Sequence, residues 1–188
     1  MRTGASPGSA SSDGLVILAE SRWPAPGDAA PPRIPGFVVS SFGPMIAAVA
    51  ERCLRSRYGA PPADQARGAR TAIVIVTAHG DIATAATVTA NVDAGRRLEP
   101  LLFFQSVPNS AAGHVAARWG LCGPVVCVSP AGDAADEGRA VAGLLIADGD
   151  ADEVLIILAE QAAQPSHRDQ ATVLLLGHQL AHPDHAAH

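Results

Sequence analysis

The sequence predicts an α/β fold in layers, in which helices cover a mixed central sheet. Segments with strand character alternate with segments of helical spacing along most of the chain, and this alternation is typical of layered α/β domains. Residues 71–77 are nearly all apolar, as expected of a strand that is buried on both faces of a sheet. Hydrophobic residues make up 48% of the 188 residues and aromatic residues only 4%, so the core is expected to consist of Ala, Val, Leu and Ile.

The first part of the chain contains two expected elements separated by a long loop. Residues 1–13 are rich in Ser, Gly and Ala and are expected to be disordered. A first strand is predicted over 14–19, and five prolines indicate an irregular loop over 20–36. Residues 37–39 are expected to form a short extended piece. Apolar residues then recur at helical spacing over 44–57, with a proline in the first turn.

The middle of the chain adds two expected helices around an apolar run. After the buried strand, a helix is predicted over 82–95, and its Ala and Thr residues give it a thin side. The apolar run 101–107 leads into a turn. Asn109 or Ser110 is a suitable N-cap for the next helix, because either side chain can accept a free backbone N–H of the first turn. Gly120 is expected to end that helix.

The last part of the chain continues the alternation. Residues 125–128 are a short apolar run between turns, which predicts a buried strand. A helix is expected over 133–147, and strands are expected over 154–158 and 171–176. One domain is therefore predicted over 14–177, followed by a His-rich flexible tail from 178 to 188.

Charge and cysteine content narrow the function classes. The net charge is −5, with 13 arginines and no lysine, and this acidic balance argues against non-specific nucleic-acid binding. No signal peptide and no run of transmembrane length is visible, so a cytoplasmic protein without a membrane partner is expected. The three cysteines, Cys53, Cys122 and Cys127, lack Cys-x-x-Cys spacing, so neither a disulfide framework nor a zinc site is expected. Cys122 and Cys127 are predicted to be small buried hydrophobes.

A spaced motif between residues 109 and 132 points to a family. Its parts, in order, are Asn109-x-x-Ala112-Gly113-His114, Gly120-Leu121-x-Gly123-Pro124, the apolar run 125–128 and the small-residue loop 129–132. This order resembles the N-terminal half of the β-ketoacyl synthases, which are thiolase-like condensing enzymes. In that family the strand leads into a Thr-Ala-Cys loop whose cysteine carries the acyl chain. Gly132 stands at that position here, and glycine has no side chain that can form a thioester.

The resemblance implies half of a thiolase-like layered α-β-α fold and a role without catalysis by this chain alone. The catalytic histidines and lysine of the family lie in the other half of its fold. The chain is therefore expected to be a truncated subunit similar to the chain-length factors. It would pair as a heterodimer with a full-length, active ketosynthase and meet acyl carrier protein only indirectly, in polyketide, aryl-polyene or fatty-acid-type biosynthesis. The matching segment, with Phe103, Phe104, Val107 and Asn109, would line the acyl tunnel near the interface. No cofactor or metal is implied.

Two alternatives to this function remain open from the residues. One is a stand-alone acyltransferase or hydrolase that uses Cys127 or Ser129, and the other is a fragment without function. Ser106 is another candidate nucleophile, with His79 or His114 as the base, but no serine lies in a Gly-x-Ser-x-Gly motif.

Two acidic or histidine-rich patterns suggest metal ligands only weakly. His178 and His182 would share one face if the tail were helical, but an incidental histidine tail is the simpler interpretation. Asp148, Asp150 and Asp152 alternate as in a calcium loop, but no Glu follows at the required position. A solvated turn is therefore predicted there.

Overall fold

A mixed five-stranded sheet lies at the centre of the computed structural model, which describes residues 14–163 and 167–178. The strands lie in the order β1-β5-β4-β2-β3. Their bounds are β1 (Leu15–Trp23), β2 (Thr71–Val76), β3 (Val125–Val128), β4 (Glu153–Glu160) and β5 (Gln170–His178). Strands β2, β3 and β4 are parallel, whereas β5 runs antiparallel to β4 and β1 runs antiparallel to β5. The predicted mixed sheet is therefore confirmed.

The inner position of β2 explains its composition. It is hydrogen-bonded to β3 on one side and to β4 on the other, and all six of its residues are buried. Because both faces of this strand are buried, polar side chains on either face would be removed from water, and its sequence is therefore a continuous apolar run. The same reasoning applies to the residues of β4 from Val154 to Ile157, each of which is fully buried.

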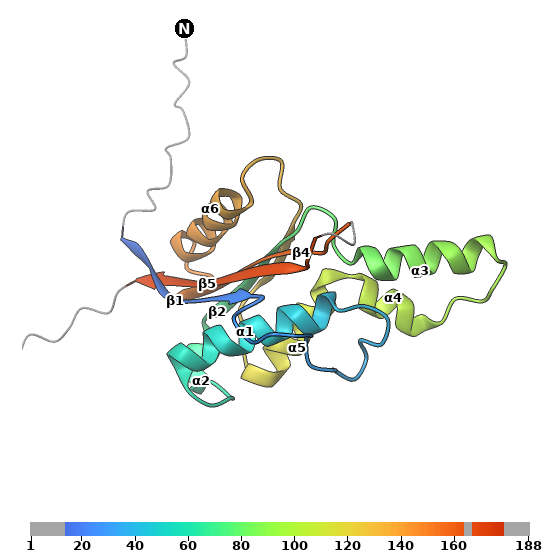
Figure 1. Ribbon diagram of the computed structural model, residues 1–188. Coiled ribbons are helices and arrows are strands. Elements are labelled where there is room, and N and C mark those ends of the chain that lie inside the picture. Colours follow the sequence, from blue (N-terminus) through green and yellow to red (C-terminus); the bar gives the residue numbers. More distant parts are fainter. Residues whose placement is uncertain (1–13, 164–166, 179–188) are drawn as a thin grey trace, which may run out of the picture.

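Helices cover both faces of the sheet, as Figure 1 shows. Helices α1 (Phe42–Tyr58) and α5 (Pro108–Trp119) pack on one face, and α6 (Ala134–Ala147) packs on the other, against β2 and β4. The buried side of α1 includes Met45, Ile46 and Val49, all with no exposed area. These residues recur at helical spacing, which places them on one stripe facing the sheet. The predicted α-β-α layering is thus confirmed.

Two short helices were not predicted from the sequence. Helix α2 (Gln65–Ala69) lies between α1 and β2, and the Asp64 carboxylate accepts two backbone N–H groups as its N-cap. Helix α4 (Pro100–Ser106) forms from the apolar run 101–107 and follows α3 (Ile82–Asp93). Figure 1 shows α3 and α4 projecting together to one side of the sheet. Residues 82–106, which include both helices and their connection, are called the arm below.

Two expected boundaries differ from the structure, and so does the expected burial of β3 and of two cysteines. β1 continues to Trp23, so the irregular loop predicted over 20–36 begins later. α5 begins at Pro108, with Val107 as its N-cap, because proline needs no hydrogen-bonded N–H at a helix start. β3 was predicted to be buried, but it lies at the edge of the sheet and its residues are exposed or half-buried. For the same reason Cys127 is exposed, as is Cys122, and only Cys53 is buried.

Several sequence predictions concern the chain ends and the metal patterns. The segment expected to be disordered, 1–13, and His182 lie outside the described residues. His178 ends β5 and is therefore not on a helix. Asp148 caps the C-terminus of α6 and Asp152 pairs with Arg70, so the aspartate-rich stretch is a solvated turn as predicted. None of the described helices combines the length and the apolar character needed to cross a bilayer.

Candidate functional site

The loop between β3 and α6 is the place where the motif predicts the family's nucleophile. Gly132 lies one residue before Asp133, whose carboxylate caps α6 by accepting the backbone N–H groups of Ala135 and Asp136, both at 2.9 Å. The Glu137 carboxylate turns back to the loop. It accepts the N–H groups of Ala131 at 2.9 Å and of Gly132 at 2.6 Å. Asp133 thus caps the helix, and Glu137 of the same helix holds the loop that precedes it.

This arrangement decides what the loop can do chemically. Free N–H groups at the start of a helix can stabilise a thiolate or a developing oxyanion. Here the N–H groups of Ala131 and Gly132 already hold the Glu137 carboxylate, and a second negative charge beside it would be repelled. Gly132 has no nucleophilic side chain. The loop therefore has no cysteine at position 132, and the N–H groups of Ala131 and Gly132 are not a vacant pair of oxyanion donors. Ser129 in the same loop is exposed, and no hydrogen bond joins it to a histidine among the described residues.

Cys127 is the nearest thiol along the chain, and its surroundings do not activate it. Its sulfur donates to Asn109 Oδ1 over 2.7 Å, so β3 and the first turn of α5 are joined at this point. Partial burial of the thiol raises its pKa above the ordinary value. A cysteine nucleophile reacts as the thiolate, which a lowered pKa favours. The shift of Cys127 therefore runs against a catalytic role.

The two candidate histidines contact other partners than the candidate serines in the described chain. His79 follows β2, its side chain is 73% exposed, and its Nδ1 atom lies 3.4 Å from Glu160 Oε2. His114 lies on α5 with its ring edge-on to Phe37, at a centroid distance of 6.3 Å. The Ser106 hydroxyl donates to the Phe103 carbonyl of its own helix. Within the described part of the chain, no hydrogen bond joins either histidine to a serine or cysteine, so the structure offers no assembled nucleophile–base pair.

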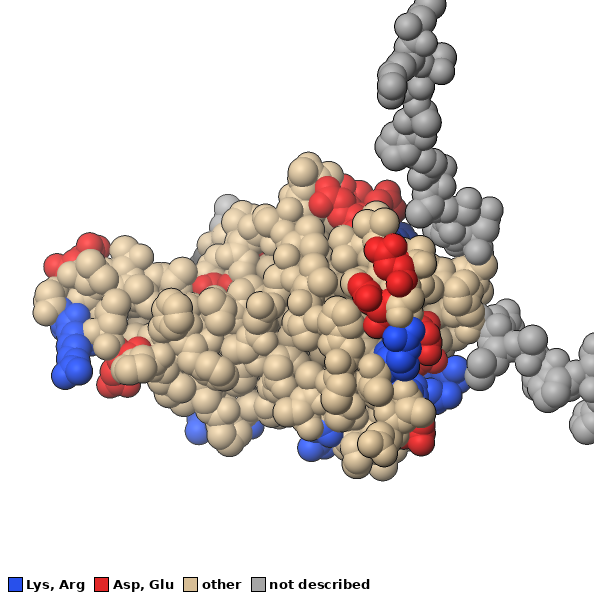
Figure 2. All heavy atoms as spheres, turned by 180° about the vertical axis from the view of Figure 1, so that it is seen from behind, with Lys and Arg blue, Asp and Glu red and all other residues tan. Residues whose placement is uncertain are grey.

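The arm, the adjoining Val107 and the neighbouring segment 38–39 carry most of the large apolar side chains that remain exposed in the described chain. These are Val38, Val39, Val92, Leu98, Leu101, Phe103, Phe104 and Val107. The Phe103 side chain is 76% exposed, whereas Phe104 is half-buried and its ring lies 6.1 Å from that of Phe37. Figure 2 shows a broad uncharged surface between the charged groups at the end of the arm and those at the other end of the molecule. Exposed apolar surfaces of this kind mark interaction sites.

The open edge of β3 is a second exposed feature, close in sequence to the first. Among the described strands, β3 pairs with β2 alone, through bonds that include Ile73 N–H to Pro124 O and Thr77 N–H to Val128 O. Since backbone groups of alternate residues face alternate sides of a strand, those of Val125 and Cys127 face away from β2. Val125 is also 41% exposed. An unpaired strand edge is a template for pairing with another chain.

The structure brings some predicted site residues together and separates others. Asn109 meets Cys127, and Phe104 lies against Phe37, but Phe103 projects from the far side of α4. Sequence reasoning missed Glu137, although an acid in the first turns of a helix that follows a small-residue loop is a usable signal. It also missed Gln105, a polar residue that is 2% exposed and for which no local sequence signal exists.

Comparison with known proteins identifies the fold. No curated protein matches the sequence. A chain of the ketosynthase ApeO in complex with its chain length factor ApeC from Xenorhabdus doucetiae matches with a TM-score of 0.66 at 17% identity, over 88% of this chain and 79% of that one. A β-ketoacyl synthase from Burkholderia phymatum STM815 matches with a TM-score of 0.70 at 15% identity, over 88% of this chain and 59% of the other. The ishigamide ketosynthase/chain length factor matches with a TM-score of 0.67 at 16% identity, over 90% and 63%.

These similarities extend the sequence resemblance to the whole fold. The chain spans only 59% and 63% of the length of the last two structures, and at these identities the likeness concerns the fold alone. The family profile described as "Beta-ketoacyl synthase, N-terminal domain" matches residues 40–182, which is most of the chain. The predicted half of a thiolase-like fold is therefore confirmed, and the chain belongs to the family of β-ketoacyl synthase N-terminal domains.

Proposed function

We propose that this chain is a non-catalytic, chain-length-factor-like subunit that pairs with an active β-ketoacyl-ACP synthase. The loop before α6 carries the proposal. The sequence motif assigns Gly132 to the position of the family's nucleophile, and in the structure Glu137 occupies the backbone N–H groups of Ala131 and Gly132. Ketosynthase–chain length factor complexes among the similar structures support a ketosynthase-like subunit of this kind. The pathway would be of the polyketide, aryl-polyene or fatty-acid type.

The exposed surfaces supply a means of pairing. The arm presents Phe103 and Phe104 to solvent, and β3 presents the unpaired backbone groups of Val125 and Cys127. Covering the apolar side chains would remove their area from water, which is favourable at about 25 cal/mol per Å2. Joining a partner strand to β3 would satisfy its open edge and fix the register between the two chains. Together the two surfaces give a heterodimer both driving force and geometry.

In this complex the segment from the end of the arm to the start of α5 would form part of the acyl tunnel wall. Phe103, Phe104, Val107 and Asn109 are the residues to which we assign this role. Val107 is 42% exposed and caps α5, so it can contact an acyl chain or the partner without rearrangement of the core. The partner would perform the decarboxylative condensation on carrier-bound substrates. Because this chain has a net charge of −5, an acidic carrier protein would dock on the partner.

Co-expression tests this proposal. The full chain is produced with a full-length ketosynthase encoded beside it, the complex is purified through a tag on the ketosynthase alone, and its mass is measured by light scattering. We expect one copy of each chain in a stable complex, with self-association of this chain when it is produced alone. A well-behaved monomer at high concentration that binds no ketosynthase would overturn the proposal. Intact-mass spectrometry of the same complex after incubation with acyl carrier thioester should find the acyl group on the ketosynthase only.

A further inference from the structure

The inner side of the arm borders an open pocket that does not include Phe103 or Phe104, the residues used in the proposed pairing. It lies between α3, α4 and residues 38–39 and has a volume of about 330 Å3. This volume is at the low end of the range of roughly 300–1,000 Å3 that small-molecule sites occupy. Its walls include the apolar side chains of Val39, Leu101 and Leu102. Phe103, Phe104 and Val107 do not line it, whereas Val38, Val39 and Leu101 belong both to its lining and to the exposed apolar surface described above.

Gln105 gives the pocket a buried polar group. Its side chain is 2% exposed, and its Oε1 atom accepts the N–H groups of Val38 at 3.0 Å and Val39 at 3.2 Å. These two bonds fix which end of the amide is the donor. The Nε2 atom is buried and has no hydrogen-bond partner among the described residues. An unpaired buried donor is unfavourable, so an acceptor on a bound molecule would stabilise the protein at this point.

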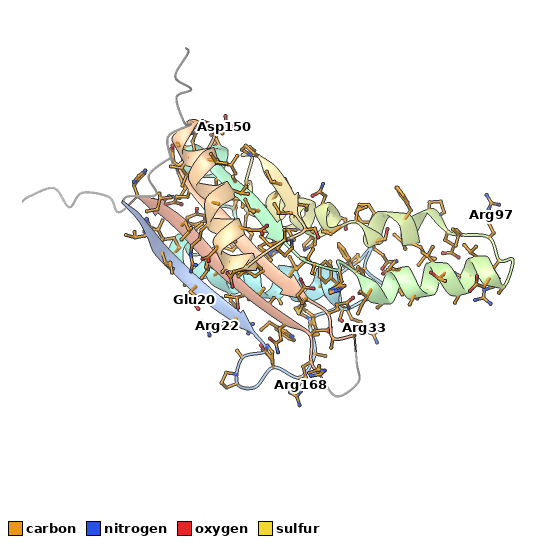
Figure 3. All side chains as sticks on the ribbon, turned by 90° about the horizontal axis from the view of Figure 1, so that it is seen from above. Glu20, Arg22, Arg33, Arg97, Asp150 and Arg168 are labelled. Atoms are coloured by element: carbon orange, nitrogen blue, oxygen red, sulfur yellow. The ribbon has the colours of Figure 1, made fainter. Side chains whose placement is uncertain are left out.

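Two arginines stand at the pocket on the end of the arm. Arg96 Nε donates to Asn91 Oδ1 over 2.8 Å, which holds its guanidinium against the end of α3. Arg97 makes no ion pair or side-chain hydrogen bond with other described residues, and Figure 3 places it at the far end of the arm. Glu99 also lines the pocket, but no ion pair joins it to either arginine in the described chain. The lining therefore carries a net charge of +1, from two arginines and one glutamate.

We propose that this pocket binds a small amphiphilic anion with three recognised parts. An aliphatic chain lies between the apolar walls, a carbonyl oxygen accepts from Gln105 Nε2, and a carboxylate or phosphate headgroup lies at Arg96 and Arg97. An acyl chain joined through an amide to a short anionic group has this chemistry. The inference is independent of the ketosynthase partner, because every residue that it uses belongs to this chain.

The test is calorimetric titration of the full chain with defined probes. N-octanoylglycine carries the amide carbonyl and a carboxylate, and the phosphate ester of N-octanoylethanolamine carries the same amide and a phosphate. We expect one site per chain for at least one of them, and the tighter of the two identifies the headgroup. Uncharged N-octanoylethanolamine should bind more weakly, and inorganic phosphate alone should bind least.

Three variants and a control place the site. Gln105→Glu keeps an acceptor for the Val38 and Val39 N–H groups but replaces the free donor with an acceptor, so it should weaken binding roughly ten-fold or more. Arg97→Ala should weaken binding roughly two- to five-fold, as expected of an exposed charge pair. Leu101→Trp fills the pocket from a partly exposed position and should abolish binding. Arg139→Ala, an exposed arginine on α6 outside the pocket, is the matched control and should bind as the wild type does.

The outcomes separate clearly. Circular dichroism first shows which variants remain folded. If Gln105→Glu does not fold, the binding measured with Leu101→Trp tests the proposal. The proposal is overturned if neither amide probe binds at millimolar concentration, or if inorganic phosphate binds as tightly as the probes. It is also overturned if the folded pocket variants bind like Arg139→Ala.

Discussion

Replacing Cys127 by proline should weaken the pairing with a ketosynthase while leaving this chain folded. Pro124 and Val128 direct their carbonyl groups to β2, so by alternation the N–H of Cys127 faces the open edge. Proline removes that N–H without removing a bond of the β2–β3 ladder, and edge strands tolerate proline at such positions. The residue before it, Val126, is already extended, as a residue preceding proline prefers.

The size of the effect follows from one lost hydrogen bond across the interface. A partner carbonyl left buried without its donor costs about 1–3 kcal/mol, which is roughly a 5- to 150-fold rise in the dissociation constant. Cys127→Val is the matched control, because it removes the thiol and its contact with Asn109 but keeps the N–H. Binding to immobilised ketosynthase and the thermal unfolding of each isolated variant are measured side by side. If the proline and valine variants bind equally well while both stay folded, β3 is not a pairing edge.

Three further predictions concern the loop that contains Gly132, the proposed tunnel wall and the core. Intact-mass spectrometry should find no acyl adduct on this chain after incubation with acyl carrier thioesters, and Gly132→Cys should not gain condensing activity; a stoichiometric adduct on the wild-type chain would contradict this. In the complex, Val107→Phe should shorten the product detected by mass spectrometry, because overfilling a packed site costs about 1–3 kcal/mol. Val107→Ala should lengthen the product or leave it unchanged. If both variants give wild-type products, Val107 has no role in chain length. Glu51→Ala should lower the free energy of unfolding by about 2 kcal/mol, since it leaves the buried Trp119 N–H without its acceptor. Hydrogen bonds from Arg118 and Trp119 lower the pKa of the Glu51 carboxyl, so its contribution to stability is complete above the unfolded-state pKa near 4.5 and is lost as the pH falls through the lowered pKa. Urea titrations at several pH values measure this contribution. Equal acid sensitivity of the wild type and Glu51→Ala would count against it.

The sequence was sufficient to predict the layers of the fold but not the position of each strand in the sheet. An apolar run such as that of β2 indicates burial on both faces, and the structure confirms it. The run that forms β3 is equally apolar, yet β3 lies at the edge and Cys127 is exposed. The composition of a strand indicates whether its side chains are apolar. It does not indicate the order of the strands, which determines the strand at the edge of the sheet. An apolar edge strand is consistent with an edge that another chain covers.

Local patterns also failed where tertiary contacts determine structure. The run that became α4 is too short for its periodicity to separate helix from strand. Its helical form places Leu102 and Gln105 on the inner side of the arm, where Gln105 binds the backbone of residues 38 and 39. No spacing rule connects residues that lie more than sixty positions apart in the chain, so this contact was not predictable.

The roles assigned to the predicted site residues stay predictions, although the structure shows where these residues lie. The motif placed Gly132 at the start of α6, and the structure shows the loop there as expected. The occupation of its N–H groups by Glu137 depends on the path of one side chain back across the first turn. Whether Phe103, Phe104, Val107 and Asn109 line a tunnel stays a prediction, because a tunnel wall between two chains is defined only in their complex.

The most direct measurement compares two cysteine deletions in the reconstituted pair. Condensation of carrier-bound substrates is followed by mass spectrometry with the ketosynthase alone, with the wild-type complex, with a complex whose ketosynthase lacks its nucleophilic cysteine, and with a complex that carries Cys127→Val in this chain. A non-catalytic partner subunit predicts full-length product only when both chains are present, loss of all product when the ketosynthase cysteine is removed, and full activity with Cys127→Val. Product formed by this chain alone, or lost on replacing Cys127 while the complex remains intact, would contradict the account.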